Sequence, residues 1–263
     1  NGVLFTGGPG KPLEAPRPYF QTATNLYHMV VEAHQSGEVV PLWGTCLGLQ
    51  TIACIAAGGR DVIGDFPLEL YAYPVNFTRD AWRSRLFGDL TPELQGDFAG
   101  NVTTNRHFFG VSPKMLSSAA PSLVALATDV ALNGETFVSV VEGRNGLPVY
   151  AVQFHPESVQ YDEGRLRDGI MVPARSPAAI RTVRYLSDFF ISQARLNAHA
   201  FPSQLAESKA LIQNIAPRQP FMFASNESLF EASMYLLPPA SGAPPGRLAS
   251  GAPPGQLASM LLG

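Results

Sequence analysis

The chain has 263 residues, of which 46% are hydrophobic and 15% charged, and its formal net charge is −3. This length allows one α/β domain with a sizeable core, and the composition is that of a globular protein. The 18 basic and 21 acidic residues are scattered along the chain. They form no basic stripe or polybasic cluster, which disfavours nucleic acids and membrane surfaces as partners. No apolar run reaches the roughly 20 residues of a membrane-spanning helix.

The first part of the sequence predicts a parallel α/β unit. Residues 1–5 form an apolar run that ends in a Gly-Gly-Pro-Gly turn, which is typical of a buried strand. Residues 25–33 carry apolar side chains at helical spacing, residues 39–43 are the next apolar strand, and residues 49–57 predict a second helix. A strand, a helix, a strand, a tight turn and a helix in this order indicate a parallel sheet.

The later part of the sequence is patterned differently. Residues 62–141 are interrupted by Pro, Gly and Asn and contain short alternating segments, which favours antiparallel strands and loops. Residues 147–154 predict a strand. Residues 177–197 predict an amphipathic helix with Pro177 in its first turn. The apolar face expected for that helix comprises Ile180, Val183, Leu186, Phe190 and Ile191.

The two ends of the chain differ from an ordinary domain. A nine-residue segment rich in Pro, Gly and Ala occurs twice in tandem, at residues 242–250 and 251–259. It lacks the apolar bulk to repay its ordering entropy, so we expect a disordered tail over residues 238–263, after a catalytic domain over residues 1–237. The chain begins directly in an apolar strand without an initiator Met, which predicts an N-terminally incomplete sequence.

The strongest local signal is Gly44-Thr45-Cys46-Leu47-Gly48, between a predicted strand and a predicted helix. A cysteine on such a turn projects above the sheet, and the flanking glycines are expected to let the chain reverse in a conformation most residues resist. The helix N-terminus favours a thiolate at this position. The sequence therefore predicts Cys46 as a nucleophile; the alternative is a buried structural cysteine.

A nucleophilic cysteine needs a base, and the base needs a third group that orients it. The segment Gln153-Phe154-His155-Pro156-Glu157 supplies both. Residues two apart in an extended chain project to the same side, so Glu157 is expected to reach His155 and to fix its tautomer. The alternative is a surface loop without a partner.

Other residues near these motifs have weaker signals. Gly7 and Gly8 end the first strand and, with the amide of Leu47, are candidates for an oxyanion hole; a plain turn is the alternative. His107 lies in a polar and aromatic segment that is expected to border a pocket or to be structural. No Cys or His pair has zinc-ligand spacing, so we expect no metal.

The remaining signals concern cysteine pairing and modification. Cys54 lies eight residues after Cys46, about 12 Å away along a helix, which is too far for a disulfide, so it is interpreted as a buried helix residue. Asn76, Asn101 and Asn226 each begin an Asn-X-Ser/Thr sequon and are glycosylation candidates. Three sequons favour a secretory, lysosomal or vacuolar destination over accidental matches in a cytosolic protein.

Two stretches resemble the nucleophile and base motifs of class I glutamine amidotransferase-like proteins: Pro41-Leu-Trp-Gly-Thr-Cys-Leu-Gly48 and Tyr150-Ala-Val-Gln-Phe-His-Pro-Glu157. Further matches make the sequence, from Asn1 to about Leu237, similar to the gamma-glutamyl hydrolase family: Trp43, residues 76–78, residues 105–107 and residues 185–190. The resemblance implies an α/β three-layer sandwich with a mostly parallel central sheet. The N-terminal strands and helix of family members would be missing here, which would expose sheet edges.

The resemblance also implies a function. An omega peptidase of this family removes gamma-linked glutamates from folylpoly-gamma-glutamates through a thioester with Cys46, with His155 taking the thiol proton and later activating water. His107 matches a second family histidine near the site, which implies a substrate-binding or supporting role. The family needs no cofactor, is secreted, lysosomal or vacuolar, and is often dimeric, so a homodimer is compatible with the sequence.

Two other functions stay open. The same Cys, His and Glu would serve a glutaminase domain that feeds ammonia to a synthetase, and ammonia release from free glutamine would favour it. A non-catalytic remnant of the fold would be indicated by an unreactive Cys46.

Overall fold

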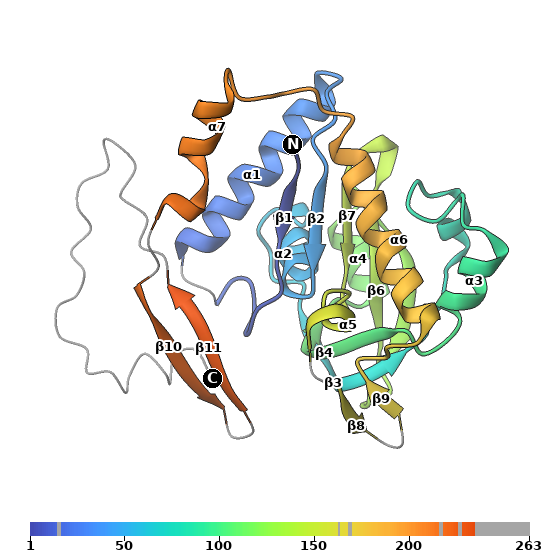
Figure 1. Cartoon of the computed structure of the whole chain (residues 1–263). Helices are drawn as coiled ribbons and strands as arrows, with labels where there is room; N and C mark the ends of the chain where they lie inside the picture. Colours follow the sequence, from blue (N-terminus) through green and yellow to red (C-terminus); the bar gives the residue numbers. More distant parts are fainter. Residues whose placement is uncertain (15–16, 163, 168–169, 216–217, 226–227, 235–263) are drawn as a thin grey trace. The chain divides into compact units, whose positions relative to one another are not determined.

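A computed structural model describes residues 1–14, 17–162, 164–167, 170–215, 218–225 and 228–234 (Figure 1). The chain divides into two units, Asn1–Ala198 and His199–Gly263. The tandem repeat lies outside the described residues, so the expected tail from residue 238 stays a prediction.

A five-stranded sheet forms the centre of the first unit, in the order β1-β2-β7-β6-β5 (Figure 1). Its strands are β1 (Val3–Phe5), β2 (Leu42–Thr45), β5 (Leu123–Val130), β6 (Thr136–Gly143) and β7 (Val149–Val152). The first three strands of that order run parallel, whereas β6 is antiparallel to both β7 and β5. The α/β prediction is confirmed, and the sheet is mixed, with its parallel half next to the predicted nucleophile.

Helices cover both faces of this sheet because its strands alternate between two cores. Leu42 and Val149 belong to one core, whereas their neighbours Trp43 and Tyr150 belong to the other. The first core packs against α1 (Arg17–Gln35), α2 (Leu47–Ala56) and α4 (Pro113–Ala119). The second packs against α3 (Pro92–Phe98), α6 (Pro177–Ala194) and the 3-10 helix η1 (Arg79–Arg83). In Figure 1, α6 lies in front of the sheet, and α2 and α4 lie behind it.

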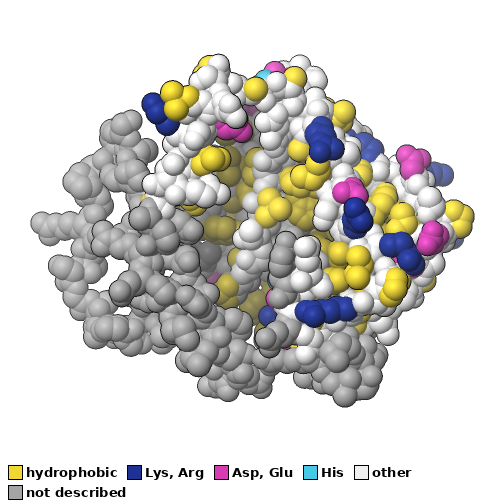
Figure 2. Space-filling view, viewed as in Figure 1, with side chains coloured by type: hydrophobic (Ala, Val, Ile, Leu, Met, Phe, Trp, Pro, Cys, Tyr) yellow, Lys and Arg dark blue, Asp and Glu magenta, His cyan; other side chains and the backbone are white. Residues whose placement is uncertain are grey.

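Helix α6 begins where the sequence predicts and ends three residues earlier. Ser176 caps it by accepting a hydrogen bond from the amide of Ala179 at 3.1 Å, and Pro177 occupies its first turn. The predicted apolar face is only partly right, because Ile180 and Ile191 are exposed. Figure 2 accordingly shows hydrophobic side chains on the surface over α6. The buried positions are Ala179, Thr182 and Leu186. Ile180 follows Ala179 and is therefore rotated by about 100° away from the core.

The antiparallel character predicted for residues 62–141 is confirmed. β3 (Gly64–Tyr73) pairs with β4 (Thr103–Gly110), and β5 pairs with β6, both antiparallel. After β7 the chain forms the short helix α5 (Ser158–Tyr161) and the hairpin of β8 (Arg165–Arg167) and β9 (Ile170–Val172). The second unit contains α7 (Gln204–Ala210), the 3-10 helix η3 (Ile212–Asn214) and an antiparallel hairpin that was not predicted, β10 (Arg218–Ser225) and β11 (Ser228–Met234).

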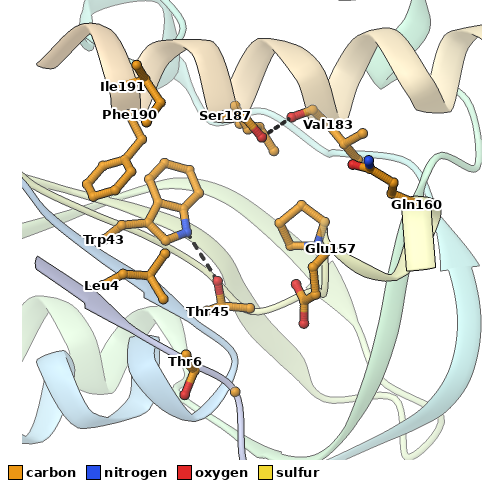
Figure 3. A pocket seen from close by; sticks show the side chains of 13 residues that line it. Leu4, Thr6, Trp43, Thr45, Glu157, Gln160, Val183, Ser187, Phe190 and Ile191 are labelled. Atoms are coloured by element: carbon orange, nitrogen blue, oxygen red, sulfur yellow. Dashed lines mark hydrogen bonds between the residues drawn. The ribbon is translucent and has the colours of Figure 1, made fainter. Parts of the chain in front are cut away.

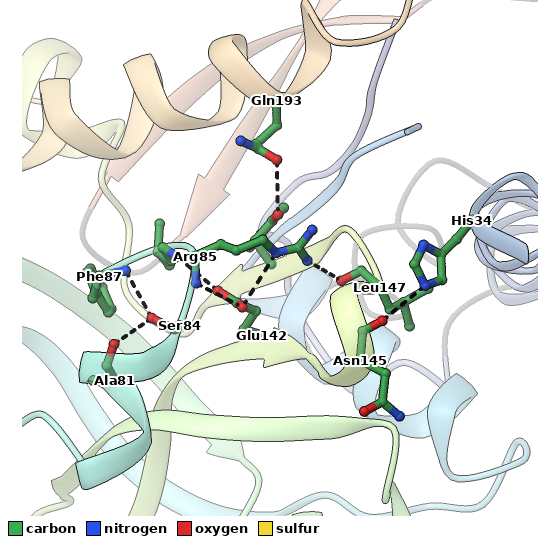
Figure 4. A network of polar contacts seen from close by, with 11 residues as sticks. His34, Ala81, Ser84, Arg85, Phe87, Glu142, Asn145, Leu147 and Gln193 are labelled. Atoms are coloured by element: carbon green, nitrogen blue, oxygen red, sulfur yellow. Dashed lines mark hydrogen bonds and ion pairs between the residues drawn. The ribbon is translucent and has the colours of Figure 1, made fainter. Parts of the chain in front are cut away.

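A buried carboxylate on β6 holds the segment after η1 against the sheet (Figure 4). Glu142 accepts hydrogen bonds from the amides of Arg85 at 3.1 Å and Leu86 at 2.9 Å. The guanidinium of Arg85 donates to the carbonyl of Leu147 at 2.7 Å, and its Nε lies 3.7 Å from Glu142. Because these groups satisfy one another, the charge is tolerated in the core and the loop is fixed at the end of the sheet distant from Cys46.

A second buried carboxyl, Asp129 on β5, is less well satisfied. It accepts a hydrogen bond from the side-chain amide of Asn76, but its Oδ2 makes no hydrogen bond of normal geometry with the described residues. Burial raises the pKa of Asp129 to about 6, although hydrogen bonds with Ser139 and Asn76 act in the opposite direction.

This raised pKa predicts a stability that falls as the pH rises. Below the unfolded-state pKa of about 4, the carboxyl is protonated in the folded and unfolded states alike. As the pH rises through about 6, the buried carboxyl must ionise in the folded state, and the stability that its neutral form contributed is lost. Asp129→Asn should therefore stabilise the fold relative to wild type by more at pH 7.5 than at pH 4, by up to roughly 3 kcal/mol. Urea unfolding of both proteins at the two pH values measures this difference, and a pH-independent difference would contradict it.

Candidate active site

The parallel pairing of β2 with β7 brings the two sequence motifs together. Thr45, the last residue of β2, pairs with Val152, the last residue of β7. The amide of Cys46, one residue further, donates to the carbonyl of Val152 at 2.8 Å. His155 follows three residues after Val152, and its amide donates to the carbonyl of Thr104 on β4 at 2.7 Å. Because parallel strands end at the same edge of a sheet, Cys46 and His155 meet there.

Cys46 occupies a conformation that side chains rarely adopt. Its φ is 51° and its ψ is −106°, and among the described residues only Leu70 and Asn145 are other non-glycine residues with positive φ. It directly precedes α2, and only 4% of it is exposed. A nucleophile on a sharp strand-to-helix turn has this geometry, in which the surrounding fold maintains the strained backbone.

The glycines on either side of Cys46 have a different role from the one predicted. Neither Gly44 nor Gly48 has a positive φ. A Cβ on Gly44 would lie 2.7 Å from the backbone carbon of Gly48, and a Cβ on Gly48 would collide with the backbone carbonyl of Phe5. The prediction that these glycines supply the reversal was wrong, because Cys46 itself takes the positive φ. The glycines instead let α2 approach β1 and β2 closely.

His155 and Glu157 are hydrogen-bonded, as the sequence predicts, but through a turn. Nδ1 of His155 lies 2.6 Å from Oε1 of Glu157. The chain is not extended between them, since Pro156 and Glu157 form a turn and the amide of Ser158 bonds back to the carbonyl of His155 at 3.3 Å. The extended-chain argument was therefore wrong, although the pair forms. The His155 side chain is 15% exposed and that of Glu157 is 50% exposed.

The environment of His155 favours its protonated form. Burial lowers its pKa, but hydrogen bonds with Cys46 and Glu157 and their negative charges outweigh burial and raise the pKa to about 10. Since Nδ1 bonds to Glu157, Nε2 is the ring nitrogen left to exchange a proton with Cys46. The three side chains thus lie as one series, with the imidazole between the carboxylate and the thiol.

Gly7, Gly8 and Leu47 surround this series. A Cβ on Gly7 would lie 2.7 Å from Cε1 of His155 and 3.6 Å from Cβ of Cys46. A Cβ on Gly8 would lie 2.9 Å from Cδ2 of Leu47. The end of β1 therefore passes directly over the histidine and the cysteine, where only a chain without side chains fits.

His107 lies on β4 behind the site, buried against the ring of Phe137 with centroids 4.9 Å apart. Burial and then the charge of His155 lower its pKa to about 4, so it is neutral near pH 7. Neither ring nitrogen makes a hydrogen bond of normal geometry with any residue that the structure describes, although backbone groups of Phe66 and Phe109 lie beside the ring. This burial fits the supporting role better than the substrate-binding one, and the role stays a prediction.

Two glutamines near the sulfur were not singled out from the sequence. Nε2 of Gln153 lies 3.6 Å from Sγ of Cys46, and Nε2 of Gln50 lies 3.4 Å from Oε1 of Gln153. Their positions in the sequence are a usable signal, since Gln153 lies two residues before His155 and Gln50 lies one helical turn after Cys46.

A cavity of about 400 Å³ adjoins the site on the side of Glu157 (Figure 3). It lies between β1, β2 and α6, and its walls are largely apolar, with the rings of Trp43 and Phe190 packed in tilted contact at 5.9 Å between centroids. Gly7, Pro156 and Glu157 form the part of its wall nearest the histidine.

The part of the chain that the structure describes contains no group of three or more His, Cys, Asp or Glu side chains that could hold a metal ion. Within the same residues, no helix is both long and apolar enough to span a membrane. Cys46 and Cys54 are both free thiols, and Cys54 is buried in α2 as predicted.

Comparison with known proteins identifies the class. The family described as Glutamine amidotransferase class-I matches residues 1–166, which contain both strand ends of the site. The chain is a class I glutamine amidotransferase-like protein.

Curated relatives narrow this class. The chain is 31% identical over 234 residues to gamma-glutamyl hydrolase B of Dictyostelium discoideum, 33% over 238 residues to gamma-glutamyl hydrolase of Rattus norvegicus, and 32% over 235 residues to that of Homo sapiens. Each alignment covers 88% of this chain, and they cover 66%, 70% and 70% of the respective relatives. The chain belongs to the gamma-glutamyl hydrolase family, whose named members are enzymes.

Proposed function

We propose that this chain hydrolyses gamma-glutamyl bonds in folylpoly-gamma-glutamates through a thioester on Cys46. The observation that carries the proposal is the hydrogen bond between Glu157 and His155 beside Cys46, at the shared end of two parallel strands, with Cys46 held at positive φ. Membership of the gamma-glutamyl hydrolase family supports the bond type, and the resemblance to that family supports the folate substrate.

In the first half of the reaction, Sγ of Cys46 attacks the γ-carbonyl carbon of a glutamyl residue. The thiol proton has passed to Nε2 of His155 before this attack, because the raised pKa of His155 favours the imidazolium, and the thiolate is the attacking species. The carbonyl oxygen becomes an oxyanion, for which the amides of Leu47 and Gly8 are the proposed donors. The carbon–nitrogen bond then breaks, and the departing amino group takes the proton from His155, leaving a thioester on Cys46.

In the second half, His155 takes a proton from water and the resulting hydroxide attacks the thioester. The carbon–sulfur bond breaks, Cys46 recovers a proton from His155, and the γ-carboxylic acid departs and loses its own proton to solvent. Glu157 holds the imidazole in the orientation required by both halves and stabilises its charged form.

The experiment that tests this function offers two substrates to the chain. We expect glutamate release from a folate pentaglutamate and little ammonia release from free glutamine. Ammonia from glutamine without glutamate from the pentaglutamate would replace the proposal by a glutaminase. No product from either, with a folded protein, would indicate a non-catalytic remnant.

Glu157→Gln is expected to lower kcat by roughly 10- to 100-fold, a milder loss than removing the nucleophile. The amide preserves the shape of the side chain, but it removes the charge that helps to raise the pKa of His155. Because Glu157 is half exposed, water compensates in part. Steady-state hydrolysis of the pentaglutamate measures the loss.

Glu93→Gln is the matched control for this change, since Glu93 is an exposed carboxylate 3.4 Å from Arg181, in a part of the fold outside the site. It should retain wild-type kcat. A Glu157→Gln variant as inactive as one without Cys46 would show that the carboxylate does more than orient the histidine.

We also propose a secretory, lysosomal or vacuolar destination and a homodimer. Of the three sequons, Asn226 lies outside the described residues. Asn76 and Asn101 are both exposed, but the side-chain nitrogen of Asn76, which a glycan would occupy, donates a hydrogen bond to the buried Asp129. Asn101 is therefore the preferred glycan acceptor of the two. Mass spectrometry before and after glycan removal tests this, and an unmodified Asn101 in secreted protein would contradict it.

A further inference from the structure

The sulfur of Cys46 has a neighbour that the proposed chemistry has not used. Gln153 lies on the bend after β7, and its side chain is fully buried. Its backbone N–H donates a hydrogen bond to the backbone carbonyl of Ser139 at 2.8 Å. Its side-chain nitrogen lies 3.6 Å from Sγ of Cys46 in donor geometry. Because sulfur is a large atom, hydrogen bonds to it are longer than those to oxygen, and this contact is a hydrogen bond.

The orientation of the Gln153 amide is set by a second glutamine. Nε2 of Gln50 donates to the backbone carbonyl of Phe109 at 2.8 Å and to Oε1 of Gln153 at 3.4 Å. A backbone carbonyl only accepts, so it fixes the nitrogen of Gln50 on that side. Oε1 of Gln153 then faces this nitrogen, and the NH₂ group of Gln153 is turned towards the sulfur.

This arrangement leaves one oxygen unsatisfied. Oε1 of Gln50 is buried without a hydrogen-bond partner among the described residues. Rotating the Gln50 amide would not relieve this, because its oxygen would then face the carbonyl oxygen of Phe109. The structure therefore tolerates a buried unpaired oxygen in the arrangement that directs a donor at Cys46.

We infer that Gln153 stabilises the thiolate of Cys46 by donating a hydrogen bond to its sulfur, and that Gln50 is the positioning residue that orients this donor. The inference rests on the proposed role of Cys46 as nucleophile. The sulfur is buried, so water solvates a thiolate there poorly, and a fixed donor takes the place of that water. A neutral amide can do this without competing with His155 for the proton.

The charged and titratable groups around the sulfur stay the same when Gln153 is changed. His155, with Glu157 behind it, follows β7, and His107 lies on β4, where the backbone carbonyl of Arg106 is 3.9 Å from the sulfur. The helix α2 carries no charged residue. A change in the pH dependence of Cys46 reactivity in a Gln153 variant therefore reports the loss of the amide donor.

The test is alkylation of Cys46 by iodoacetamide as a function of pH, without substrate, resolved by peptide mass spectrometry. Gln153→Met keeps the length of the side chain and removes the donor. We expect its reaction at neutral pH to be roughly tenfold slower and its midpoint to rise by about one pH unit, since a hydrogen bond to a charged group is worth about this much. Gln50→Met should shift the midpoint in the same direction by less.

Two features of the chain provide controls. Gln193→Met is a matched substitution on α6, where Gln193 accepts a hydrogen bond from Tyr150 at 3.2 Å, and it should leave the alkylation profile unchanged (Figure 4). Burial raises the pKa of the Cys54 thiol to about 11, so alkylation at Cys54 does not obscure the signal from Cys46. Cooperative thermal unfolding shows which variants are folded.

A folded Gln153→Met variant with the wild-type rate and midpoint would overturn the inference. If Gln153→Met does not fold, the alkylation profile of Gln50→Met becomes the test. An unchanged profile in folded Gln50→Met would also overturn the inference. The proposed function is tested separately, because the alkylation assay contains no substrate. It would fail if a chain without Cys46 still hydrolysed the pentaglutamate.

Discussion

Cys46→Ala is expected to abolish glutamate release from a folate pentaglutamate while leaving substrate binding largely intact. The thiol is the only group that forms the new covalent bond in the proposed reaction, so its loss removes the pathway, with a fall in kcat of at least about 10⁴-fold. Removing a sulfur from a buried position at the end of β2 changes the surrounding structure little. Product formation and, separately, binding of the pentaglutamate measure the two effects.

Cys54→Ala is the matched control for this variant. Cys54 is a second free, buried thiol, in the interior of α2, and it takes no part in the site. We expect it to retain full activity with at most a modest loss of stability from the small cavity. Activity near wild type in Cys46→Ala, or its loss in both variants, would refute the assignment of the nucleophile.

His155→Asn is expected to be nearly as damaging, with a fall in kcat of about 10³-fold or more. The variant loses the group that accepts the thiol proton, protonates the leaving amine and activates water. It also leaves Glu157 without its 2.6 Å partner. Cys46 remains in place, so slow alkylation of its sulfur should persist while hydrolysis is lost, and the two assays together separate a missing base from a missing fold.

The control for this variant is His28→Asn, on the exposed side of α1. Its ring makes an edge-on contact with Tyr27, with centroids 6.0 Å apart, away from the site. We expect wild-type turnover. If His155→Asn kept more than about a tenth of wild-type activity, another group would have to serve as base, and His107 would be the next to test.

The sequence predicts which residues of the candidate site lie together because they belong to short local segments. Cys46 lies within one strand-turn-helix segment, and His155 and Glu157 lie within three residues of each other. The approximate positions of β1, β2, α2, β7 and α6 follow from apolar runs, helical spacing and a proline in the first turn.

The rest depends on packing between distant segments. Gly44 and Gly48 are needed for the approach of α2 to β1, which the sequence around them does not reveal. The donor function of Gln153 depends on Gln50, 103 residues away, and on the carbonyl of Phe109 on β4. The exposure of Ile180 likewise depends on where the sheet meets α6.

The most direct test of the central claim is a search for the thioester itself. The chain is mixed with a folate pentaglutamate, quenched in acid at increasing times and digested, and parallel reactions contain hydroxylamine. We predict a transient acyl group on the Cys46 peptide and, with hydroxylamine, the hydroxamate of the shortened folate, neither of which forms with Cys46→Ala. Steady glutamate release with an unmodified Cys46 peptide at every time, and no hydroxamate, would contradict the mechanism.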